Sequence, residues 1–67
     1  MELVVNGSVR TLDPPIATVA DLVEAMALVG KRIAVERNGE IVPRSRYAQT
    51  VLVAGDRLEI VGAVGGG

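Results

Sequence analysis

The sequence contains no cysteine, no histidine, no tryptophan and no phenylalanine, and its single aromatic residue is Tyr47. Without cysteine there is no disulfide framework, thiol nucleophile or thiolate metal site. Without histidine, neither Ser-His-Asp catalysis nor an ordinary zinc site can be built. One aromatic side chain is also too few for a platform on which nucleic-acid bases stack. The composition therefore argues against an enzyme.

The net charge is small as well, because seven Lys and Arg residues offset eight Asp and Glu residues over 67 positions. This balance lacks the positive field that binding to a phosphate backbone needs, so we expect no nucleic-acid partner. The longest apolar stretch, residues 16–29, is interrupted by Asp21 and Glu24 and is shorter than the roughly 20 residues of a membrane-spanning helix. The first residues lack the positive charge of a secretory signal. We therefore expect a cytoplasmic protein with no membrane partner.

What the sequence does have is aliphatic residues and two Asn-Gly pairs, since 49% of its positions are hydrophobic. Asn-Gly favours the tight turn of a β-hairpin, in which both central residues need a positive φ. The first pair predicts a hairpin that joins residues 1–6 to residues 8–12. The second predicts a hairpin that joins residues 32–36 to residues 40–42.

A helix is predicted between the two hairpins. Thr18 can cap its first turn, and Asp21 can complete a capping box. Apolar residues then recur at helical spacing, and Gly30 stands where a left-handed C-terminal cap belongs. The apolar positions are Val19, Leu22, Val23, Met26 and Val29. The pattern predicts a helix over residues 19–29.

The remaining segments complete an α+β fold. Residues 44–49 are predicted as a short helical turn or loop, 50–53 as a short strand, and 57–61 as a final strand. A helix between hairpins allows the first strand to pair in parallel with a later one. The expected architecture is the β-grasp (ubiquitin-like), a mixed four- to five-stranded sheet with one main helix on one face. We assign residues 1–62 to this domain and residues 63–67 to a flexible C-terminal glycine tail.

The sequence ends in Gly65-Gly66-Gly67, directly after the last predicted strand. Terminal glycines are often only a frayed end. After a β-grasp pattern they also suit entry into a narrow tunnel, because glycine has no Cβ. A carboxylate delivered in this way becomes reactive by attacking the α-phosphate of ATP, and a sulfur nucleophile can convert the acyl-adenylate to a thiocarboxylate.

The chain resembles the ThiS family of sulfur carriers in thiamin biosynthesis over nearly its whole length. The block at residues 38–48, the Gly-Asp pair and the terminal glycine pair carry most of the resemblance. The matching segments are Asn6-Gly7, Thr18-Val19 with Leu22, Asn38 to Ala48, Gly55 to Val61, and Gly66-Gly67. Two positions depart from the family pattern, since Tyr47 stands where Trp is usual and Gly65 where many members have a bulkier residue.

The resemblance implies that Gly67 is the modified residue, first adenylated and then converted to a thiocarboxylate. A ThiF-like adenylyltransferase would use ATP and magnesium, so the chain itself would bind no cofactor. A relay of the cysteine desulfurase type would supply sulfur, and thiazole synthase would receive it. Val64, Gly65 and Gly66 would enter the active sites of these partners.

Two sets of residues are candidates for docking the partners. Arg44 and Arg46, close in sequence to Arg37, are expected to be ordinary solvated charges, or else a patch for an acidic partner surface. Val4, Ala34 and Val61 are candidates for an apolar docking patch on the outer face of the sheet.

Other functions stay open at this stage. Carriers of another pathway, such as the small subunit of molybdopterin synthase or a carrier for cysteine synthesis, would share the chemistry of the tail. A β-grasp binding module whose glycines do not react is the alternative from a different class.

Overall fold

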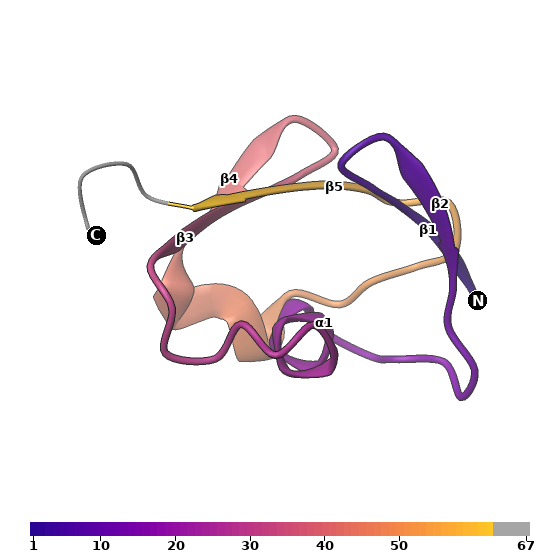
Figure 1. Cartoon of the computed structure of the whole chain (residues 1–67), viewed down its shortest axis with the longest axis horizontal. Coiled ribbons are helices and arrows are strands. Elements are labelled where there is room, and N and C mark those ends of the chain that lie inside the picture. The colour runs from indigo at the N-terminus through magenta and orange to yellow at the C-terminus, as the bar shows by residue number, and fades with distance from the viewer. Residues whose placement is uncertain (63–67) are drawn as a thin grey trace.

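The computed structural model describes residues 1–62. Within them, five strands form one mixed sheet in the order β2-β1-β5-β3-β4, and helix α1 lies across one of its faces (Figure 1). The strands are β1 (Glu2–Val5), β2 (Ser8–Thr11), β3 (Ile33–Arg37), β4 (Glu40–Val42) and β5 (Arg57–Gly62). The α-helix α1 is Val19–Ala25, and a 3₁₀ helix, η1, covers Arg44–Gln49. This confirms the predicted α+β arrangement of a β-grasp. The predicted tail at 63–67 lies outside the described residues.

The pairing of the strands places β5 at the centre of the sheet. It runs parallel to β1, with Val4 opposite Arg57 and Val5 opposite Leu58. On its other side it runs antiparallel to β3. The predicted parallel pairing of the first strand with a later one is confirmed, because α1 returns the chain across the sheet between the two hairpins (Figure 1).

Both predicted Asn-Gly turns are present, and both have positive φ at their two central residues. The φ angles are 51° and 81° at Asn6-Gly7, and 51° and 87° at Asn38-Gly39. Asn6 also supports the sheet through its side chain. Its Nδ2 donates to the Ile60 carbonyl at 3.0 Å, and its Oδ1 accepts from the Ile60 amide at 2.7 Å. The carboxamide thus continues the bonding of β1 to β5 beyond the point where the backbone turns away.

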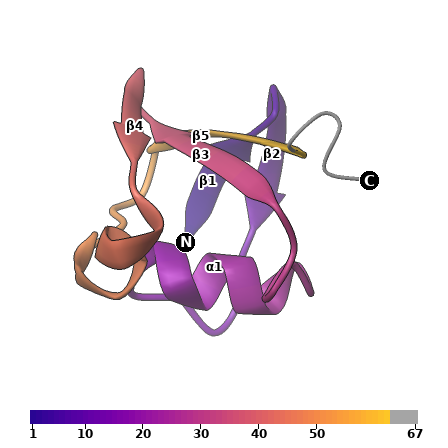
Figure 2. The ribbon, with the colours of Figure 1, turned by 90° about the vertical axis from the view of Figure 1, so that its left-hand side faces the viewer.

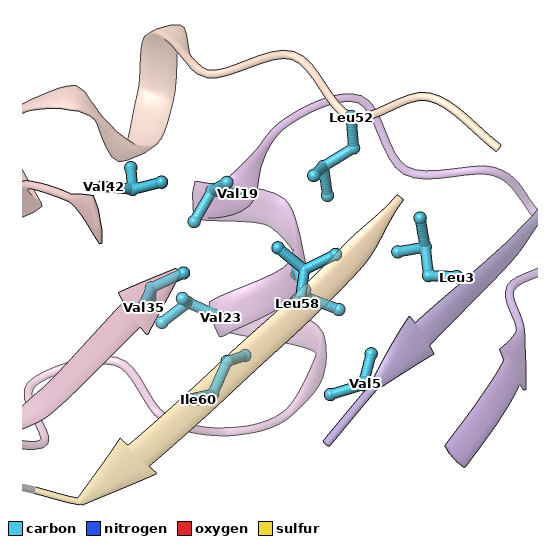
Figure 3. Packing of buried hydrophobic residues seen from close by; sticks show 10 residues of the cluster. Leu3, Val5, Val19, Val23, Val35, Val42, Leu52, Leu58 and Ile60 are labelled. Atoms are coloured by element: carbon cyan, nitrogen blue, oxygen red, sulfur yellow. The ribbon is translucent and has the colours of Figure 1, made fainter. Parts of the chain in front are cut away.

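The core lies between the sheet and α1 and is entirely aliphatic (Figure 3). Alternate residues of the central strands face it, as the period of two in a strand requires. Tyr47 and Met26 are only partly buried against this core. The buried members are Leu3, Val5, Val19, Leu22, Val23, Val35, Val42, Leu52, Leu58 and Ile60. Removal of this aliphatic surface from water is what drives so short a chain to fold.

Helix α1 begins as predicted and ends earlier than predicted. Asp21 N donates to Thr18 Oγ1 at 3.2 Å, and Asp21 Oδ2 accepts from Thr18 N at 3.1 Å, which completes the capping box. The prediction of a helix to residue 29 is wrong, because Ala27 adopts a φ of 58°. Ala27 N donates to Glu24 O and Leu28 N to Val23 O, the bonds of a Schellman motif that ends the helix.

The predicted strand at residues 50–53 is also wrong. Val51 makes a single isolated bridge to Thr18, and Leu52 N donates to Ala17 O at 2.8 Å. These bonds fasten the segment to the chain that enters α1 and not to an edge of the sheet. Leu52 is buried in the core from this position.

Candidate functional site

The functional hypothesis concerns the end of β5 at Gly62, where the chain leaves the sheet. Gly62 lies opposite Ile33 in the ladder between β5 and β3. The carbonyl oxygen of Arg32 lies 4.0 Å from the position of a Cβ at Gly62. The residues that begin β3 therefore lie beside Gly62, at the end of the molecule that faces the viewer in Figure 2. The predicted modified residue Gly67 and the predicted tail residues Val64, Gly65 and Gly66 lie outside the described residues.

A hollow of about 200 Å³ opens beside this end of the sheet. Its walls come from α1, the loop that leads to β3, the start of β3 and η1. The walls are mostly apolar, and Lys31 and Arg44 are the two cations among them. The lining residues are Ala20, Val23, Leu28, Val29, Gly30, Lys31, Ile33, Arg44 and Tyr47. We call this hollow, together with Arg32 and Gly62, the exit end.

Arg44 belongs to the exit end because η1 packs close to the loop that precedes β3. Its Nη2 donates to the Lys31 carbonyl at 3.3 Å, a long bond between exposed residues. The two cationic residues are therefore held near each other, with no carboxylate within 4.0 Å of either among residues 1–62. The exit end thus combines an apolar hollow with unneutralised positive charge.

The opposite end of β5 is built around the buried carboxylate of Asp56. Arg37 Nε donates to Asp56 Oδ2 at 2.8 Å, Val53 N donates to the same oxygen at 2.9 Å, and Asn38 Nδ2 donates to Oδ1 at 3.0 Å. Asn38 Oδ1 in turn accepts from Arg57 N at 2.9 Å. These contacts join the turn between β3 and β4 to the start of β5. We call Arg37, Asn38, Val53 and Asp56 the pinned end.

The pinned end accounts for the perturbed ionisation of Asp56. Burial of the carboxyl raises its pKa, but the hydrogen bonds from Val53, Asn38 and Arg37 and the charge of Arg37 outweigh that effect and hold the pKa below its usual value. A perturbed carboxyl can mark a catalytic site. Here its two oxygens are occupied by structural donors at the far end of β5 from Gly62, so its role is to hold the fold together.

The structure places the three arginines that are close in sequence at different sites. Arg37 lies at the pinned end, in the ion pair with Asp56. Arg44 lies at the exit end, whereas Arg46 borders a separate hollow beside β4, together with Ile41, Val42, Pro43, Gln49 and Thr50. Arg37 is therefore not a neighbour of the other two, because β3 runs away from η1 and its last residue is Arg37. A docking role for Arg44 and Arg46 stays a prediction.

The predicted apolar docking residues are also only partly together. Ala34 and Val61 lie opposite each other in the register of β3 and β5, and both are exposed on the outer face of the sheet. Val4 is half-buried and lies beside Arg57, four positions before Val61 along β5. Four residues of strand span roughly 13 Å, so Val4 is not continuous with the other pair.

The sequence reasoning missed Lys31 as part of the candidate site. The available signal was the adjacent pair Lys31-Arg32, directly before the strand that borders β5. Among residues 1–62 there is no group of three acidic residues that could hold a metal ion. No helix in the same range is long and apolar enough to cross a membrane.

A protein-family model, described as the ThiS family, matches residues 3–67. The chain belongs to the ThiS family. It is 38% identical to the sulfur carrier protein ThiS of Bacillus subtilis, over 97% of this chain and 98% of that protein. It also resembles the crystal structure of the thiamine biosynthesis protein ThiS from Geobacter metallireducens. That match has a TM-score of 0.86 and 33% identity, and it covers all of both chains. These names associate the ThiS family with sulfur carriage and thiamin biosynthesis, as the resemblance implied.

Another relative places a ThiS-like segment inside a larger protein. The whole chain is 46% identical to part of a protein named thiazole synthase from Paramagnetospirillum magneticum. The chain spans only 20% of the length of that relative. A segment of the ThiS family therefore occurs within the same polypeptide as a thiazole synthase.

Proposed function

We propose that this chain carries sulfur as a thiocarboxylate on Gly67 and donates it for thiazole formation in thiamin biosynthesis. The proposal rests on the match of the ThiS family model to residues 3–67, a range that includes the three glycines. The fold is compatible with it, because the described domain and its last strand, β5, end at Gly62, five positions before Gly67. The chain supplies no His or Cys of its own.

The chemistry has two steps, and both take place in partner proteins. An oxygen of the Gly67 carboxylate attacks the α-phosphorus of ATP, and pyrophosphate leaves, which gives an acyl-adenylate. A sulfur nucleophile at the oxidation level of hydrosulfide then attacks the acyl carbon, the carbon–oxygen bond to AMP breaks, and the thiocarboxylate forms. A relay that holds its sulfur as a persulfide delivers it at this level when a second thiol of the relay takes up the other sulfur as a disulfide. A ThiF-like adenylyltransferase supplies ATP and magnesium, and a cysteine desulfurase type of relay supplies the sulfur. In this scheme the chain is the substrate of enzymes and needs no catalytic side chain.

Thiazole synthase is the proposed acceptor of the sulfur. Support comes from the relative from Paramagnetospirillum, in which a segment 46% identical to this chain forms part of a protein named thiazole synthase. Joining a donor to its acceptor raises their effective concentration, which gives a physical reason for such an arrangement. The carriers of molybdopterin or cysteine synthesis share the tail chemistry and differ only in the acceptor.

The first test is the intact mass of the chain after incubation with the adenylyltransferase, ATP and a sulfur source. We expect one oxygen-to-sulfur exchange, located at Gly67 by fragmentation. The control lacks Gly66 and Gly67. It should keep its fold and its binding to the adenylyltransferase, yet accept no sulfur. An unchanged mass of the full chain, with a partner shown to be active on its own carrier, would contradict the proposal.

The acceptor is tested separately by growth. Loss of the gene should create a requirement for thiamin or its thiazole moiety, and a plasmid that encodes the full chain should remove it. A plasmid that encodes the chain without Gly66 and Gly67 should not. A defect in molybdenum cofactor or in cysteine synthesis would assign the carrier to another pathway.

A further inference from the structure

The positively charged side chains of the chain differ in whether they form an ion pair. Among residues 1–62 one ion pair forms within 4.0 Å, between Arg37 and Asp56 at the pinned end. Lys31, Arg32 and Arg44 lie at the exit end, and all three are exposed. Surface charges on a small protein are usually spread out and contribute little to its stability. Their concentration at the end of the sheet that contains Gly62 therefore calls for a reason other than folding.

The length of the chain beyond Gly62 limits where this surface can lie when Gly67 reacts. Five residues follow Gly62 in the sequence. A fully extended chain spans at most about 3.5 Å per residue, so these five reach no more than about 18 Å. Whichever active site holds the Gly67 carboxylate, Gly62 must therefore lie within that distance of it. The exit end is thus obliged to face the partner protein.

The hollow adds an apolar feature to this surface. Val29 lines it and leaves 69% of its surface exposed, and Ile33 and Tyr47 are only half-buried. A volume of about 200 Å³ is ample for one apolar side chain. Lys31 and Arg44, which line the same hollow, offer donors to carboxylates beside that side chain.

Building on the proposed function, we propose that the exit end docks on an acidic segment of the adenylyltransferase at the mouth of the site that receives Gly67. One apolar side chain of that segment fills the hollow, and neighbouring Asp or Glu carboxylates pair with Lys31 and Arg44. The adenylyltransferase is the partner we assign, because it must recognise the carrier before any sulfur is attached. Lys31 and Arg44 attract its acidic segment during the encounter and are neutralised by that segment once the complex forms.

The test is to measure adenylation by pyrophosphate exchange, with carrier concentration and salt as variables. In the exit variant, Lys31→Gln with Arg44→Gln, we expect the KM for the carrier to rise about five- to tenfold at low salt, as two exposed ion pairs would give. The kcat should change less than twofold. The difference in KM should shrink at high salt, because screening weakens exposed charges.

The matched control removes the same charge elsewhere. Arg10→Gln with Arg57→Gln alters two exposed arginines on β2 and on the outer face of β5. This control should leave the KM within twofold of the original chain. Val29→Asn should raise the KM at every salt concentration. Its own control, Val51→Asn, should not, although Val51 is 60% exposed.

The outcomes separate this proposal from the one it rests on. If the original chain supports no pyrophosphate exchange with an active partner, the carrier function fails and this inference fails with it. If the original chain reacts but the exit variant matches the arginine control, only the docking surface is wrong. A defect confined to transfer of sulfur to thiazole synthase would also overturn it. Thermal melts of all variants should coincide, which shows that the KM effects are not due to unfolding.

Discussion

The two ends of β5 use charge in opposite ways. At the pinned end, a buried carboxylate accepts three hydrogen bonds from Arg37, Asn38 and Val53, and all of its donors come from this chain. At the exit end, Lys31 and Arg44 have no carboxylate within 4.0 Å among residues 1–62, and the hollow between them is open. At the pinned end the buried charge finds all of its partners within the domain, whereas the exit end has exposed cations and an open hollow that a partner protein could contact. The contrast predicts that substitutions at the pinned end change stability and those at the exit end change binding.

The largest expected effect on stability comes from Asp56→Ala. The substitution leaves the Arg37 guanidinium, the Asn38 amide and the Val53 N–H without their acceptor. Breaking a buried ion pair typically costs 3–5 kcal/mol, and because Arg37 is 31% exposed and can be hydrated, we expect the lower limit, about 3 kcal/mol. Urea unfolding followed by circular dichroism measures this free energy. A loss below about 1 kcal/mol would mean that the pinned end adds little to stability.

Asp56 also predicts how stability depends on pH. Its pKa in the folded state lies below the usual value of 3.8, so the folded state favours the charged carboxylate. The resulting stabilisation is complete above the unfolded-state pKa and is lost as the pH falls through the folded-state pKa. We expect the free energy of unfolding to fall as the pH is lowered below about 4.

Asp56→Asn provides the control for this pH dependence, because its side chain does not titrate and has almost the same shape. It should be less stable than the original chain at neutral pH and should lose less stability on acidification. Parallel slopes of stability against pH for the two proteins would show that another carboxylate is responsible.

The parts of the structure that follow from local sequence were predicted well. The Asn-Gly turns, the Thr18–Asp21 capping box and the alternation of β5 each depend on residues within a few positions of one another. The pinned end was not predicted, because Arg37 and Asp56 are 19 positions apart and meet only through the pairing of β3 with β5. The exit end was missed for the same reason, since Arg44 reaches the Lys31 carbonyl across 13 positions.

The predicted end of α1 and the predicted strand at residues 50–53 were wrong, because backbone hydrogen bonds there do not follow the local sequence pattern. Val29 fits the apolar spacing of α1, but the Schellman motif at Ala27 ends the helix before it. A sequence does not reveal that an alanine will adopt the left-handed conformation, which is why Gly30 was the natural choice for the cap. Residues 50–53 have strand composition, yet their backbone bonds to Ala17 and Val19 at the entry to α1. A high strand propensity shows only that a segment suits an extended, half-buried position. Residues 50–53 occupy such a position beside the entry to α1, and not at an edge of the sheet.

The residues that hold a positive φ differ in how well they tolerate it. Asn38 at the pinned end and Gly30 at the exit end, with φ of 51° and 79°, are residue types suited to this conformation, whereas Ala27, three positions before Gly30, has φ of 58°. Ala27 is exposed, so Ala27→Gly removes the strain of its Cβ without opening a cavity. We expect the free energy of unfolding to rise by about 1 kcal/mol.

The matched control is Ala25→Gly, also exposed but within the last turn of α1, and it should lower stability by up to about 1 kcal/mol. If both substitutions destabilise the protein alike, the helix does not end at Ala27 in solution. A gain at Ala27 alone, with adenylation unchanged, would show that strain beside the exit end can be relieved without cost to docking.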